Sequence, residues 1–94
     1  MRYLGIDYGG KRIGVAVSDV GARIAFPHSV IYRRGNTFIC DQILAIVKHG
    51  KVELIVVGLP LGMNGEETEE SSHVREFVKE LAAKVPQAEV NGDL

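Results

Sequence analysis

The sequence predicts a single α/β domain built on a mixed β-sheet. Four short apolar runs, some of them alternating with small or polar residues, predict strands. Two segments with apolar residues three and four positions apart predict helices. The order strand, strand, strand, helix, strand, helix favours an antiparallel meander that is joined to parallel strands, with helices on the faces of the sheet.

The composition agrees with one folded domain and excludes other classes. With 94 residues, 46% hydrophobic and 24% charged, the chain has a globular make-up rather than that of a disordered or collagen-like protein. Cys40 is the single cysteine, so the sequence offers neither an internal disulfide nor a zinc-binding spacing. No apolar run approaches the roughly 18 residues of a membrane span. We therefore expect a cytoplasmic protein that does not enter membranes.

The first three strands are expected to form a meander. An apolar run from Tyr3 stops at Asp7, and a Gly-Gly turn leads into a second strand over residues 13–18, which alternates apolar with small residues. Glycines such as Gly14 leave one face of this hairpin open to close approach. The third strand, near residues 23–32, contains Pro27, which cannot donate to a ladder and therefore places the strand at an edge or at a bulge.

A helix and a buried strand follow the meander. Asn36 or Thr37 is expected to cap the helix, and Gly50 occupies the place of a C-terminal left-handed residue. The continuous apolar run at residues 54–57 is typical of a parallel strand that is buried on both faces, and it should lie beside the first strand. The apolar face of this helix comprises Ile39, Ile43, Ile46 and Val47.

The second helix is expected to begin after Thr68, an N-cap residue followed by the acids Glu69 and Glu70. Residues 88–90 are expected to begin a short fifth strand, before an Asn-Gly turn at Asn91. This order of elements, with a carboxylate at the end of the first strand, is that of the ribonuclease-H-like α/β fold. The apolar face of the second helix comprises Val74, Phe77, Val78, Leu81, Ala82 and Val85.

The local sequence pattern indicates Asp7 as a candidate functional residue. It stands where a central strand ends, at the edge of an α/β sheet where ligands gather. An acid there, followed by Lys11 and Arg12, can hold a divalent cation while the bases attract phosphate. The alternative is an Asx-turn, in which the carboxylate bonds its own backbone.

Charge is divided unevenly along the chain. Residues 1–51 contain eight Lys or Arg and three acids, whereas residues 52–94 contain three Lys or Arg and nine acids. A basic first half suits a polyanionic partner, but the net charge of −1 favours a mixed, solvated surface when composition alone is considered.

Two blocks of sequence carry a family resemblance. Residues 5–19 read GIDYGGKRIGVAVSD, and residues 55–65 read IVVGLPLGMNG. Together and in this order they resemble the YqgF/RuvX family, over residues 1 to about 86. The resemblance implies a ribonuclease-H-like, metal-dependent nuclease of the bacterial cytoplasm. Such proteins are described as nucleases that mature the 5′ end of pre-16S ribosomal RNA during ribosome biogenesis, and also as Holliday junction resolvases.

The resemblance implies roles for particular residues. Asp7 matches the family's first metal-binding acid and would be catalytic, holding Mg²⁺ or Mn²⁺. Lys11 and Arg12 match the basic pair after it and would contact structured RNA or branched DNA, including ribosomal assembly intermediates. The residues that would border the cleft are Gly9, Gly58, Leu59, Pro60, Asn64 and Gly65.

The sequence departs from the family pattern towards its end. The family's second acid, in an Asp-Glu-Arg motif after the fifth strand, and its third, in a later helix, have no match. Asp93 is the one carboxylate near the expected place, and a residue beside the terminus is a poor substitute. We therefore expect one domain, residues 1–94, that lacks the family's C-terminal part, binds the metal weakly and cleaves little by itself.

Two other function classes stay open from the sequence. The Asp-x-Gly hairpin also resembles the first phosphate-binding hairpin of the sugar-kinase, actin and chaperone ATPase group, which needs a second lobe. Alternatively, the chain is an inactive domain that binds nucleic acid through its basic half without cutting it.

Overall fold

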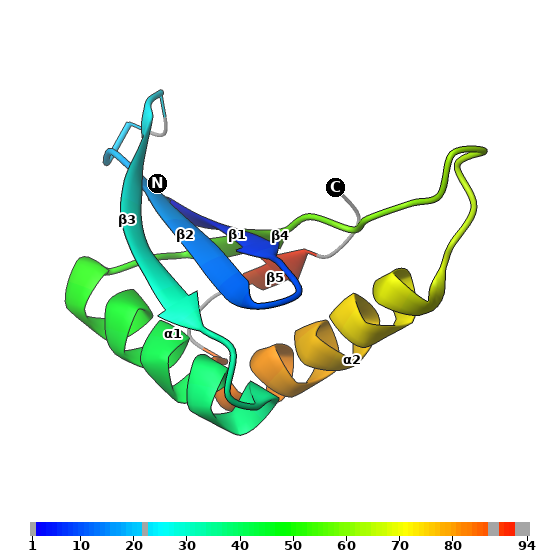
Figure 1. Cartoon of the computed structure of the whole chain (residues 1–94). Coiled ribbons are helices and arrows are strands. Elements are labelled where there is room, and N and C mark those ends of the chain that lie inside the picture. Colours follow the sequence, from blue (N-terminus) through cyan, green and yellow to red (C-terminus); the bar gives the residue numbers. More distant parts are fainter. Residues whose placement is uncertain (1, 22, 87–88, 92–94) are drawn as a thin grey trace.

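The computed structural model describes residues 2–21, 23–86 and 89–91, which form a five-stranded sheet and two helices (Figure 1). The sheet has the order β3-β2-β1-β4-β5. Its strands are β1 (Tyr3–Tyr8), β2 (Arg12–Ser18), β3 (Ala25–Tyr32), β4 (Leu54–Val57) and β5 (Glu89–Asn91). The helices are α1 (Asn36–Gly50) and α2 (Glu69–Lys84).

The strand pairing confirms the predicted mixed sheet. β1 pairs antiparallel with β2, and β2 pairs antiparallel with β3. β1 also pairs in parallel with β4, where Ile6 lies opposite Val57, and β4 pairs in parallel with β5. The central strand β1 therefore joins the meander to the parallel half.

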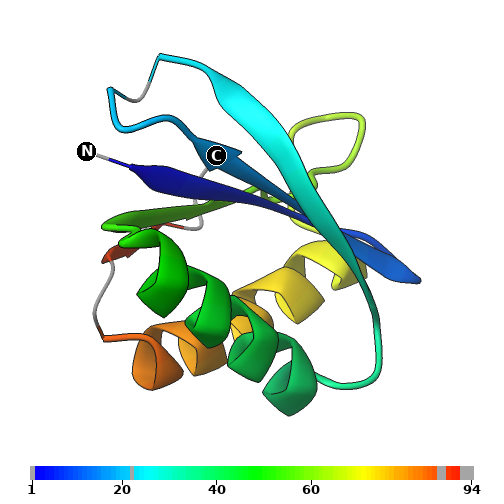
Figure 2. The ribbon, with the colours of Figure 1, turned by 90° about the vertical axis from the view of Figure 1, so that its left-hand side faces the viewer.

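Both helices cover the same face of the sheet (Figure 2). The expectation of helices on the faces of the sheet is met on one side alone for the residues that the structure describes. The prediction that β4 is buried on both faces is wrong, because Ile55 and Val57 are buried whereas Leu54 and Val56 are partly exposed. The second face of the sheet, called the open face below, has no helix over it within the described part of the chain.

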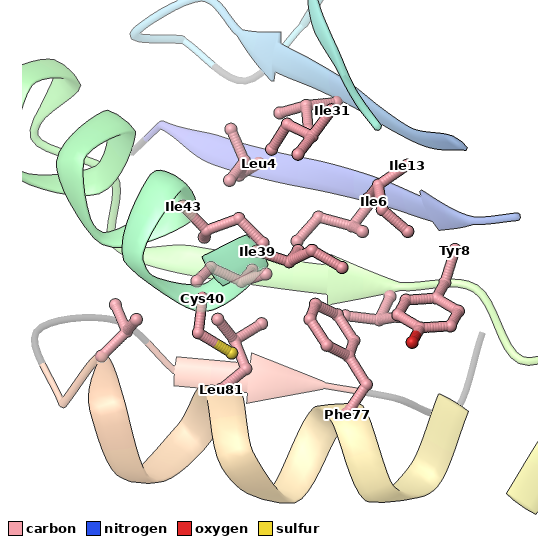
Figure 3. Close-up of a cluster of buried hydrophobic side chains, with 14 of the residues drawn as sticks. Leu4, Ile6, Tyr8, Ile13, Ile31, Ile39, Cys40, Ile43, Phe77 and Leu81 are labelled. Atoms are coloured by element: carbon pink, nitrogen blue, oxygen red, sulfur yellow. The ribbon is translucent and has the colours of Figure 1, made fainter. Parts of the chain in front are cut away.

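The core lies between the sheet and the two helices, where side chains from both layers meet (Figure 3). Leu4, Ile6 and Tyr8 of β1 point into it, and the Tyr8 ring lies 4.6 Å from the Phe77 ring of α2. Phe77 is fully buried and is the largest such side chain among the described residues. Cys40 belongs to this core. Within the described residues, neither helix combines the length and the apolar character that a bilayer span needs.

The ends of α1 differ from the prediction. Neither Asn36 nor Thr37 caps the helix: the N-cap is Gly35, at φ 142°, because the Asn36 side chain instead accepts a hydrogen bond from the Tyr8 hydroxyl at 2.7 Å. Gly50 is still helical, and the left-handed residue is Lys51, at φ 53°. The Gly50 carbonyl oxygen accepts a hydrogen bond from the Arg2 guanidinium at 2.9 Å, and the chain turns one residue later than expected.

The predicted N-cap of α2 is confirmed. Ser71 donates its backbone N–H to the Thr68 hydroxyl at 3.4 Å, and the Ser71 hydroxyl accepts from the Thr68 backbone N–H at 3.0 Å. This reciprocal pair is a capping box, which stabilises the start of the helix. Ala82 was expected in the apolar face and is exposed, whereas Val74, Leu81 and Val85 are buried.

The two edges of the sheet behave differently from one another. β3 is an edge strand, and its register shifts beside Pro27, as the proline predicted. The fifth strand forms at the other edge, and Asn91 belongs to it rather than to a turn, because it pairs with Val56.

Burial of Cys40 leads to a chemical prediction. Desolvation, helped by the nearby Glu80 carboxylate, raises the pKa of the Cys40 thiol from its ordinary value of 9.0 to about 11. A raised pKa means less thiolate at pH 8, and the thiolate is the reactive form. We expect labelling by a disulfide reagent at pH 8 to be at least about a hundredfold slower in the native protein than in concentrated guanidinium. Equal rates in the two solvents would contradict the burial of this side chain.

Candidate functional site

Asp7 lies on the open face of the sheet. Its neighbours Ile6 and Tyr8 are buried against the helices, so the alternation of β1 directs Asp7 the other way, where it is exposed. Its cross-strand partner is Gly14. A Cβ added to Gly14 would come within 3.7 Å of the Asp7 Cβ, so the glycine leaves free space beside the carboxylate.

A shallow depression of about 500 Å³ surrounds Asp7 on this face. Within the described residues of its lining, Asp7 carries the only charge. Gly58, which directly follows β4, contributes to the depression, so the structure brings one predicted loop residue beside Asp7. The other residues that line the depression are mostly small or apolar and include Gly5, Gly14, Ala16, Val30 and Val56.

The Asx-turn alternative is not what the structure shows. Among the described residues the Asp7 carboxylate has no hydrogen-bond or ion-pair partner. The hairpin is closed by its backbone instead, through a 3.0 Å bond from the Gly9 N–H to the Arg12 carbonyl. A Cβ on Gly9 would lie 2.6 Å from that carbonyl oxygen, so glycine is required there by close approach. The Asp7 carboxylate is thus available to a ligand.

Lys11 and Arg12 are exposed on the hairpin between β1 and β2. Arg33 and Arg34, which directly follow β3, lie at the same end of the sheet, since the Arg33 N–H donates to the Lys11 carbonyl at 3.0 Å. The adjacent first turn of α1 contains no acid. This end of the sheet therefore carries four cationic side chains, and we call Lys11, Arg12, Arg33 and Arg34 the basic end.

Arg33 holds the hairpin in place, a role that the sequence reasoning missed. Its guanidinium lies 4.6 Å from the centre of the Tyr8 ring, and Nη1 donates to the Gly10 carbonyl at 3.2 Å and to the Gly9 carbonyl at 3.5 Å. Tyr8 is itself tied to both helices, through Asn36 and Phe77. The basic position of Arg33 was visible in the sequence, but no local pattern could show that its partners lie more than twenty residues earlier.

Most of the predicted cleft loop lies away from Asp7. Figure 1 shows the chain between β4 and α2 extending away from the sheet. Gly65 has φ 77°, and the tip is closed by a 3.0 Å bond from its N–H to the Gly62 carbonyl. Glu67 pairs with Arg75 at 2.6 Å, a contact that lowers the pKa of the Glu67 carboxyl. The loop residues that do not line the depression are Leu59, Pro60, Asn64 and Gly65.

The donor set for a metal ion is small in the part of the chain that the structure describes. It contains no group of three or more His, Cys, Asp or Glu side chains placed to hold a metal. Asp7 supplies one carboxylate, and Asp93 lies outside the described residues. Because Mg²⁺ keeps its waters in competition with a single ligand, these residues do not by themselves fit a resident divalent ion.

The strand order, the two antiparallel pairs and the exposed acid on the central strand define a ribonuclease-H-like domain. RuvC from Thermus thermophilus has the same fold, with a TM-score of 0.65 at 19% identity over 98% of this chain and 64% of that one. A protein from Cytophaga hutchinsonii described as a "putative sugar kinase" also matches, with a TM-score of 0.59 at 12% identity, over 97% of this chain and 35% of that one. Likeness at these identities concerns the fold alone.

The chain belongs to the RuvX family, whose model is described as "Holliday junction resolvase" and matches residues 1–92. A relative from Nitratidesulfovibrio vulgaris is 44% identical over 86% of this chain, and one from Maridesulfovibrio salexigens is 40% identical over 90%. Both carry the name "Putative pre-16S rRNA nuclease". The chain spans 57% and 63% of the length of these two relatives.

The Arg33 contacts predict a difference between two neighbouring arginines. Arg33→Met removes two hydrogen bonds and a ring contact and should lower the free energy of unfolding by about 1–2 kcal/mol. Arg34→Met removes a ring contact with Phe38 at 5.0 Å and no hydrogen bond to the hairpin, so it should cost about 0.5 kcal/mol or less. Urea unfolding of both variants measures the difference, and equal losses would contradict the role of Arg33.

Proposed function

We propose that this domain is the nucleic-acid-binding and reaction-centre part of a nuclease that acts on structured RNA, with 5′-end maturation of pre-16S ribosomal RNA in the cytoplasm as its process. The observation that carries the proposal is the exposed, unpaired Asp7 carboxylate beside the basic end of the sheet. Membership of the RuvX family and the names of the relatives support the same class of reaction.

The basic end supplies the binding energy in this proposal. Lys11 and Arg12 contact phosphates of the RNA backbone, which releases counterions and makes the affinity depend on salt. Phosphate contacts of this kind position the strand without reading its sequence. A backbone that follows the basic end passes over the neighbouring open face, where the depression around Asp7 leaves room for it.

Asp7 is the acidic residue of the proposed reaction centre. Phosphodiester hydrolysis by this class of enzyme uses divalent ions held by several carboxylates. Since the described residues provide one, we derive no step through a metal. We expect this chain to bind RNA more effectively than it cleaves it.

The RuvX description favours a second substrate, a four-way DNA junction. The same basic end and the same carboxylate would act on this DNA, because contacts to phosphate do not distinguish RNA from DNA. A binding domain without cleavage is the third outcome, and the following measurements separate these alternatives.

Binding of a structured RNA hairpin tests the role of the basic end. We expect the affinity to fall with salt and the slope of log K against log salt to shrink by about 0.7–0.9 for each of Lys11→Gln and Arg12→Gln. Lys79→Gln, an exposed lysine of α2, is the matched control and should leave the slope unchanged. A four-way DNA junction titrated in parallel identifies the preferred substrate. Equal slopes in all the variants would contradict the proposed contacts.

Cleavage of the same RNA with Mg²⁺ or Mn²⁺ tests the role of Asp7. We expect slow, metal-dependent cleavage by the chain, and its loss in Asp7→Asn, because the amide cannot provide the negative charge. Cleavage that persists in Asp7→Asn would remove Asp7 from the reaction centre. Fast cleavage that Asp7→Asn abolishes would instead show that the single carboxylate is a sufficient donor set.

A further inference from the structure

The edge strand β3 carries an exposed aromatic side chain, Tyr32, opposite Arg12 in the strand register, and a shallow depression beside it also includes Phe38 and Gln42 of α1. Tyr32 is 68% exposed and Val30 is 57% exposed, whereas Ile31 between them is 8% exposed and faces the helices. An exposed tyrosine ring offers a large flat surface, and covering it with another flat group is favourable. The ring is therefore free to stack on a ligand.

Strand register places this ring close to the candidate reaction centre. Asp7 lies opposite Gly14, and Gly14 lies opposite Val30, so one row crosses three strands. Tyr32 lies two residues beyond Val30 and opposite Arg12. Two strand spacings and two residues separate the Cα atoms of Asp7 and Tyr32 by roughly 12 Å. Gly14 lies between Asp7 and Val30, so no side chain of that row separates the two residues on the open face.

The Tyr32 ring and the neighbouring Arg12 are suited to bind an unpaired nucleotide. An aromatic face stacks on a nucleobase, and an adjacent arginine can pair with the phosphate or stack on the base. The basic end supplies positive charge beside the ring, complementary to a polyanionic strand. A base inside a duplex has both faces covered by its neighbours, so it cannot use an aromatic platform of this kind.

We propose that Tyr32 and Arg12 form a base-stacking platform, which takes an unpaired RNA nucleotide near the phosphodiester that faces Asp7. The inference rests on the proposed function and narrows its substrate to RNA with an unpaired segment at the site of action. Arg33 keeps the platform rigid, because it directly follows Tyr32 and its N–H donates to the Lys11 carbonyl next to Arg12.

The test compares two substitutions of Tyr32 on single-stranded RNA and on an RNA duplex of the same sequence. Tyr32→Ala should weaken binding of the single strand about tenfold and change duplex binding less than twofold. Tyr32→Phe keeps the ring and should bind the single strand as the unchanged protein does. The salt slope should stay the same in Tyr32→Ala, since no phosphate contact is lost.

Phe26→Ala is the matched control. Phe26 is a half-exposed aromatic residue of the same strand, but it lies opposite Val17, at the end of β3 far from Arg12 and the basic end. The Phe26→Ala variant should bind RNA with unchanged affinity. Thermal unfolding checks that each variant is folded.

The outcomes separate this inference from the proposed function. Salt-dependent RNA binding that Tyr32→Ala leaves unchanged overturns the platform and leaves the nuclease proposal in place. Equal losses for single strand and duplex also overturn it. Absence of RNA binding by the unchanged protein overturns the proposed function and the platform together.

Discussion

The alternation of β1 between the two faces of the sheet is the constraint on which the rest depends. Leu4, Ile6 and Tyr8 enter the core, so Asp7 must face the opposite side. A slip of one residue in the pairing with β2 and β4 would bury the carboxylate and expose the apolar set. The burial of three large side chains thus also keeps the acid exposed. The alternation of β1 therefore determines both the stability of the fold and the exposure of Asp7.

Tyr8 connects that alternation to the basic end. Its ring contacts Phe77 on one side and the Arg33 guanidinium on another, and its hydroxyl donates to Asn36. Both helices, the hairpin and the segment after β3 therefore meet at one side chain. The same fold occurs in RuvC and in a protein described as a "putative sugar kinase", so the fold alone cannot decide the chemistry. The position of the acid, the small residues around it and the adjoining cations carry the functional argument.

The sequence by itself determined the elements and the central acid. Periodicity located the apolar strands and the face of α2, because those patterns follow from local backbone geometry. The start of α2 could be predicted from Thr68, because its capping partner Ser71 is only three residues away in the sequence. Pro27 predicted an edge or a bulge because it has no N–H to donate, and the structure has both at β3. The two sequence blocks identified the family over most of the chain.

Only the tertiary structure decided which faces are covered and which side chains support the site. The apolar run at β4 looked buried on both sides, yet the described helices lie on one side of it. Asn36 looked like a cap, but a distant tyrosine hydroxyl takes its side chain. Arg33 bonds to Gly10, and Tyr32 lies opposite Arg12, so both meet residues that are twenty or more positions earlier in the chain. Periodicity encodes which residues share a face, whereas contacts between distant segments depend on the packing of the whole chain.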